Sequence, residues 1–170
     1  IFCPGAKSKI SDCTNFVSQA LLAGGWPMAG THNASDRAAA DQWWFGGSML
    51  VSASHSWAGA QNLYDYLRLS GRGRIVSRIE ELLPGDLVQF RSADGSHIWH
   101  STVVTGVVPG DLLLSYHTND NRDKALSATE VPAELWVLWK IADVIPQPQK
   151  GSLRPANFSP ATATRSYIRR

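Results

Sequence analysis

The first periodic segment of this 170-residue chain begins Asp12-Cys13-Thr14-Asn15-Phe16-Val17-Ser18-Gln19. Apolar side chains recur here three and four positions apart, which is the spacing of one helical face. Ser11 or Asp12 can cap the start of such a helix, and Gly24-Gly25 can end it. The pattern predicts a short amphipathic helix whose inward face carries Cys13, Phe16, Val17, Ala20 and Leu21.

Cys13 would lie in the first turn of that helix, where the positive end of the helix dipole favours thiolate over thiol. A cysteine on such a face is often only a small core residue. The alternative is a nucleophile, which needs a basic side chain close to it in space. We therefore examined the downstream sequence for histidines that the fold could bring to Cys13.

The rest of the chain separates into helices followed by strands. A second helix is predicted to about Leu69 with Ser56 as its N-cap, after a weak helix or turn near residues 36–42. β-branched and apolar runs then predict strands over residues 87–90, 100–106, 112–117 and 135–141. This order indicates an α+β fold, with the N-terminal helices packed on an antiparallel sheet.

Composition is that of one globular domain: 44% of residues are hydrophobic and 18% are charged. We assign residues 1–145 to this domain and residues 146–170 to a proline-containing basic tail. The net charge is +2, and the segment from Lys150 onward holds five basic residues and no acid, which leaves −3 on the remainder. Apolar runs are too short for a transmembrane segment.

The turn pair Pro109-Gly110 allows a test of which side chains share a face. If these two residues are the centre of the hairpin, paired positions sum to 219, and His100 lies opposite Asn119. His117 is then diagonal to His100 and on the same face, because strand side chains alternate with period two. A register slip of one residue would place the two histidines on opposite faces. With this register the hairpin would present His100 with His117 or Asn119 on one surface, and the start of the first helix could dock there to complete a Cys–His–polar triad.

Ordered motifs along the chain extend this interpretation. The helix motif Asp12–Gln19 is followed by Ser56-Trp57-Ala58-Gly59, by Pro84-Gly85-Asp86-Leu87-Val88-Gln89-Phe90, by His100-Ser101 and by His117-Thr118-Asn119-Asp120. This series resembles the putative amidase domain family, which is related to the NlpC/P60 and CHAP cysteine peptidases. The resemblance implies a papain-like fold.

The resemblance also implies roles for individual residues. Cys13 matches the nucleophile, His100 the general base, and His117 the third polar residue, with Asn119 and Asp120 as alternatives. The backbone of Cys13 would contribute to the oxyanion hole, with Asp12 or Gln19 as the source of a second donor. Trp57 and Trp99 adjoin motif residues and are predicted as cleft walls.

The function implied is that of a cysteine amidase or endopeptidase acting on peptide stems of peptidoglycan. The basic tail and the absence of an initial methionine suit a secreted or periplasm-acting wall hydrolase, or the toxic domain of a larger antibacterial effector with a cognate immunity protein. No cofactor, metal or nucleic-acid partner is expected.

Four alternatives start from other features. A deamidase or transglutaminase on a protein substrate would use the same residues. A carbohydrate- or peptide-binding module would use some of the seven tryptophans. A metal hydrolase could use His97 and His100, but residues three apart on a strand point to opposite faces. A carboxylate-pair glycosidase has little support, because Glu80 and Glu81 are adjacent and diverge.

Overall fold

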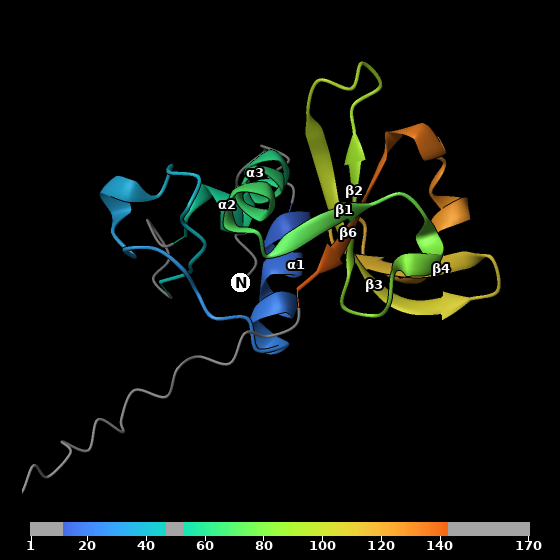
Figure 1. Ribbon diagram of the computed structural model, residues 1–170, viewed down its shortest axis with the longest axis horizontal. Helices are drawn as coiled ribbons and strands as arrows, with labels where there is room; N and C mark the ends of the chain where they lie inside the picture. Colours follow the sequence, from blue (N-terminus) through green and yellow to red (C-terminus); the bar gives the residue numbers. More distant parts are fainter. Residues whose placement is uncertain (1–11, 47–52, 143–170) are drawn as a thin grey trace, which may run out of the picture.

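The computed structural model describes residues 12–46 and 53–142, and it has the predicted α+β organisation. The α-helices gather beside one six-stranded antiparallel sheet (Figure 1). The predicted basic tail over residues 146–170 lies outside the described residues.

The first helix, α1, spans Cys13–Ala23 and ends at Gly24, as predicted. Its first and fifth positions, Cys13 and Val17, are buried, and so is Leu21 one turn further on. Phe16 is only partly buried and packs on the edge of the core. Spacing of apolar side chains thus explains how α1 lies against the sheet.

Two helices follow after a loop that contains the 3-10 turn η1 (Ala34–Asp36): α2 (His55–Ala58) and α3 (Ala60–Ser70). The prediction that Ser56 caps the second helix is wrong. Ser54 precedes α2, and the Ser56 hydroxyl is buried inside it, where it donates to the carbonyl oxygen of Gln42. α3 ends at Gly71, whose φ of 67° suits glycine best.

The strands are arranged in the order β1-β6-β2-β3-β4-β5. The four predicted strands are present with small changes of boundary, as β2, β3, β4 and β6. Two short edge strands, β1 and β5, were not predicted. The bounds are β1 Gly73–Val76, β2 Leu87–Arg91, β3 Ile98–Val108, β4 Asp111–Tyr116, β5 Asn121–Ala125 and β6 Trp136–Ile141.

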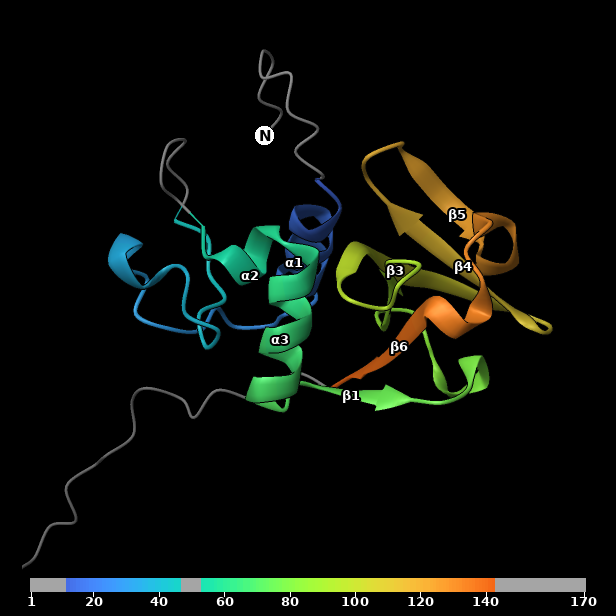
Figure 2. The ribbon, with the colours of Figure 1, turned by 90° about the horizontal axis from the view of Figure 1, so that it is seen from above.

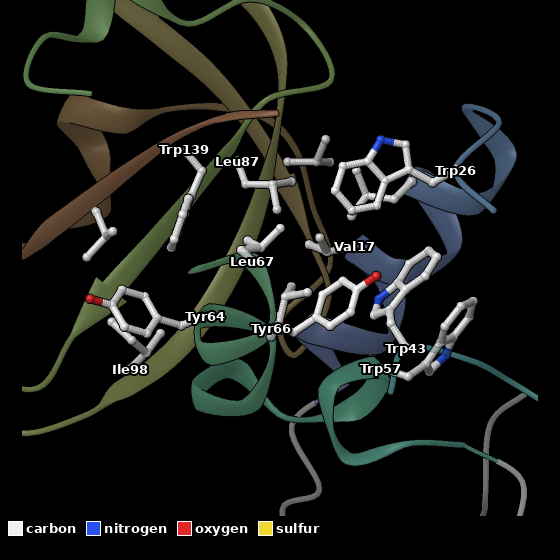
Figure 3. Close-up of a cluster of buried hydrophobic side chains, with 14 residues drawn as sticks. Val17, Trp26, Trp43, Trp57, Tyr64, Tyr66, Leu67, Leu87, Ile98 and Trp139 are labelled. Atoms are coloured by element: carbon white, nitrogen blue, oxygen red, sulfur yellow. The ribbon is translucent and has the colours of Figure 1, made fainter. Parts of the chain in front are cut away.

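Each face of the sheet has its own apolar cluster. On the helix face, side chains of the helices pack against Leu87, Val103 and Trp139. The view from above separates this helix layer from the sheet (Figure 2), and a close-up shows the cluster (Figure 3). On the far face, Val88, Phe90 and other strand residues pack with residues next to three 3-10 turns: η2 Ile79–Glu81, η3 Leu126–Thr129 and η4 Ala133–Leu135. The side of the sheet that a residue faces therefore determines whether it can meet α1.

A buried carboxylate joins the turn before β2 to the end of β6. Asp86, which is 4% exposed, accepts backbone N–H bonds from Leu83 at 2.7 Å and from Ile141 at 2.8 Å. It also pairs with Lys140 at 2.8 Å. The motif Pro84-Gly85-Asp86 therefore has a structural role in this fold.

Within the described ranges, none of the helices has the length and apolar composition needed to cross a bilayer.

Candidate active site

A β-bulge changes the register on which the triad geometry depended. Near the hairpin tip, Val108 pairs with Asp111 and Gly106 with Leu113, as predicted. Beyond the irregularity at Thr105, Val104 pairs with Leu114 and Val103 with Ser115, a slip of one residue. Because a slip of one exchanges the faces, the prediction that His100 and His117 share a face is wrong.

His100 lies on the far face of the sheet. It pairs with Phe90 across β2 and β3, and its ring stacks on that phenylalanine with centroids 5.9 Å apart. Trp99 stacks on it at 5.2 Å, and Tyr116 meets it edge-on at 4.9 Å. The imidazole is thus buried, at 5% exposure, among aromatic rings that belong to or adjoin the far-face cluster.

His117 lies on the helix face, over the first turn of α1. Its Nδ1 is 3.1 Å from Oδ2 of Asp12, the residue before Cys13. Its ring stacks on Phe16, three residues after Cys13, with centroids 4.6 Å apart. Since a carboxylate can only accept, Nδ1–H donates, and this bond favours the tautomer of the neutral ring in which Nε2 carries the lone pair. His117 therefore contacts α1 on both sides of Cys13 in the sequence.

Cys13 opens α1 with 1% of its surface exposed. Its Sγ lies 3.6 Å from Oγ1 of Thr14, and the same hydroxyl donates to Oγ of Ser101 at 3.1 Å. Ser101 also accepts from Nε2 of Gln89 at 2.9 Å. These hydrogen bonds fix the start of α1 against β3 and β2.

Asp12 is the N-cap residue of α1, yet in the described part of the chain its side chain makes no capping hydrogen bond to the helix backbone. Oδ1 instead accepts from Nδ2 of Asn15 at 2.8 Å. The Oδ1 of Asn15 in turn accepts from the indole N–H of Trp57 at 2.8 Å. The Asp12 carboxylate thus points toward Asn15 and His117 and not toward the backbone N–H groups of the helix.

The remaining predicted residues take other places. Trp57 is 1% exposed and belongs to the core, so it does not wall a cleft. Trp99 is 47% exposed but adjoins His100 on the far face. Gln19 is exposed, six residues along α1 from Cys13 and away from the helix start. Asn119 is exposed, and Asp120 lies 4.0 Å from Nε2 of His117.

Thr14, Asn15 and Ser101 lie within the quoted motifs but were not predicted as site residues, and Phe16 was predicted only as part of the inward helical face. Their closeness in the sequence to Cys13 or His100 was the signal that could have identified them.

In the described residues, no group of three or more His, Cys, Asp or Glu side chains could hold a metal ion. The turn before β3 has one strongly perturbed acid. Hydrogen bonds from Ser92 and Ser96 hold the pKa of the Asp94 carboxyl well below its usual range, so it is ionised and orders that turn at neutral pH.

An α+β domain with a cysteine at a helix start and a carboxylate–histidine pair beside it is a candidate hydrolase. Residues 4–138 match the family described as the putative amidase domain, and the chain therefore belongs to that family. The family description indicates a hydrolase that acts on amide bonds.

A curated relative also matches. Over 123 residues the chain is 35% identical to the protein named uncharacterized protein YhbB of Bacillus subtilis (strain 168). The matched region covers 70% of this chain and 37% of that protein, so the chain spans little more than a third of its relative. No solved structure matches the chain.

Proposed function

We propose that the chain is a cysteine amidase in which Cys13 is the nucleophile, His117 the general base and Asp12 the residue that orients it. One observation carries the proposal: the Asp12–His117 hydrogen bond of 3.1 Å over the helix turn that Cys13 opens. This is the order of groups in a nucleophile–histidine–carboxylate triad. The same arrangement, a helix that starts at a cysteine and packs on an antiparallel sheet, is our basis for proposing a papain-like fold.

In this mechanism the Cys13 thiolate attacks the carbonyl carbon of an amide, and the protonated His117 then gives its proton to the leaving amine. A water molecule, deprotonated by His117, hydrolyses the resulting thioester and restores the thiolate. The His117 side chain is 45% exposed, which suits a group that must meet both substrate and water.

The start of α1 would stabilise the oxyanion. The first backbone N–H groups of a helix have no partner within the helix, and they point toward its N-terminus. Because the Asp12 side chain is directed to Asn15 and His117, it does not compete for them. The N–H of Cys13 is the donor that we assign to the tetrahedral intermediate.

His100 is the base that the family resemblance implies, and its position on the far face supports a different role. We assign it to packing between the rings of Phe90 and Tyr116. Variants of the two histidines separate these assignments and are described in the Discussion.

For the substrate we propose an amide bond in peptidoglycan stem peptides, the class that the resemblance to NlpC/P60 and CHAP peptidases implies. Such a substrate would place the reaction outside the cytoplasm, in a wall hydrolase or a toxic effector domain. Within the same site, deamidation of a protein side chain is the second candidate, because it also proceeds through a thioester.

The test uses purified peptidoglycan incubated with wild type, Cys13→Ala and Cys13→Ser, with products identified by mass spectrometry. We expect wild type to release new amino and carboxyl termini and both variants to release none. Equal release by Cys13→Ala would overturn the nucleophile assignment. Loss of ammonia from a protein substrate, without chain cleavage, would support the deamidase instead.

A further inference from the structure

We propose that Asn15 and Trp57 are positioning residues that hold Asp12 against His117, so that helix α2, through its buried Trp57, sets the orientation of the general base. The inference deepens the proposed function and rests on it, because the role of His117 as general base is part of that proposal. The hydrogen-bonded path itself can be tested without any activity.

The path is directional at every step. The indole N–H of Trp57 can only donate, so the atom of Asn15 that it contacts must be the amide oxygen. The Asn15 nitrogen then faces Oδ1 of Asp12, which can only accept. Both partners therefore impose the same orientation on the Asn15 amide. Oδ2 of Asp12 is left to accept from Nδ1–H of His117.

Trp57 is a rigid anchor for this path. Its ring packs against the rings of Trp43 and Phe45, with centroid distances of 4.9 Å and 5.6 Å. Figure 3 shows Trp57 beside Trp43 in the core. Its backbone oxygen accepts from the buried hydroxyl of Ser18 at 2.9 Å. The Trp57 side chain therefore bonds to Asn15, and its backbone bonds to Ser18 about one turn further along α1.

Asp12 needs such an anchor because its side chain is 50% exposed. An exposed carboxylate can exchange among rotamers and bind water, which would release the imidazole. A fixed bond to Oδ1 limits this freedom. The groups that face His117 are then the Asp12 carboxylate, the Phe16 ring and, at 4.0 Å, Asp120.

The experiment breaks the path at two points. Asn15→Ala removes both bonds without opening a core cavity, and Trp57→Phe removes the indole N–H. Nitrogen-15 NMR at pH 8 reports which ring nitrogen of His117 carries the proton. We expect the Nδ1–H form to dominate in wild type and to give way to the Nε2–H form in both variants.

In the amidase assay both variants should lower kcat about 10-fold with little change in KM, the effect expected for one hydrogen bond to a carboxylate. Two controls are matched to them. Asn62→Ala alters an exposed amide on α3, and Trp136→Phe removes an indole N–H that donates to Val131 elsewhere. Both controls should keep the wild-type tautomer and kcat.

A wild-type tautomer in both Asn15→Ala and Trp57→Phe would overturn the proposal, whatever the activity. So would an equal tautomer change in Trp136→Phe, because the cause would then be a loosened core. If wild type showed no amidase activity, the proposed function would fail, while the NMR result would still decide whether Asn15 and Trp57 position His117.

Discussion

The two faces of the sheet hold one candidate histidine each, and the two histidines differ in every property that matters for catalysis. The side chain of His117, on the helix face, is 45% exposed and hydrogen-bonded to a carboxylate. His100, on the far face, is 5% exposed and surrounded by aromatic rings. A histidine that must exchange protons needs water and a partner for its second nitrogen, and of these two histidines it is His117 whose side chain is exposed and bonded to a carboxylate.

The comparison teaches that family motifs and strand geometry can assign the same role to different residues. The motif His100-Ser101 resembles the base-bearing strand of cysteine peptidases, yet it is Ser101 that meets α1, through Thr14. Three experiments test this contrast, from the largest expected effect to the smallest.

Substitution of each histidine in turn should give the largest difference in kcat/KM. We expect His117→Ala to lower kcat/KM about 1,000-fold or more, because a general base would be lost. His100→Phe, which keeps a ring of similar size between Phe90 and Tyr116, should leave kcat/KM within about threefold. Steady-state rates on the same amide substrate, with circular dichroism to confirm folding, make the comparison. The reverse order of effects would return the role of base to His100.

The variant Asp86→Ala tests whether the motif Pro84-Gly85-Asp86 stabilises the fold or takes part in catalysis. Asp86→Ala leaves Lys140 and two backbone N–H groups without their acceptor, and we expect it to lower the free energy of unfolding by about 3 kcal/mol or more. Denaturant titration measures this loss. Lys140→Met is the matched control and should cost less, since Asp86 would keep both backbone donors. A stable Asp86→Ala protein that had lost activity would place Asp86 in the catalytic machinery instead.

The smallest effect compares one hydroxyl on each face. Thr14→Val removes the bond from α1 to Ser101, and Thr102→Val removes the bond to the Val88 carbonyl within the sheet. Each should lower the free energy of unfolding by about 1 kcal/mol. Only Thr14→Val should also reduce kcat, because only Thr14 adjoins Cys13. Equal kinetics in the two variants would show that the helix–sheet bond does not affect the nucleophile.

Local patterns predicted the parts of this fold that local forces determine. The spacing Cys13–Val17–Leu21 and the stop at Gly24 correctly placed α1, and β-branched runs placed the four central strands. β5 lacks such a run and β1 has only the pair Ile75-Val76, and both form because they pair with β4 and β6. Their pairing energy comes from residues distant in the sequence, and composition does not reveal it.

The candidate site was predictable only in part for a related reason. A cysteine at the start of a helix can be recognised from seven or eight residues. The contact between Asp12 and His117 depends on the hairpin register, and the bulge at Thr105 shifts that register. Gly106 is the signal that could have warned of it, since glycine inside a strand often marks a bulge. A Cβ at Gly106 would approach Leu113 to 3.1 Å, which is consistent with that reading.

The extra residue at Thr105 has a consequence for comparing this chain with its relatives. Because the bulge takes up Thr105, Val104 pairs with Leu114 just as it would if that residue were missing. A relative with one residue fewer there would therefore still hold its counterparts of His100 and His117 on opposite faces. Only a relative that kept the residue and paired it in the ladder would shift the register by one and bring the two histidines to one face.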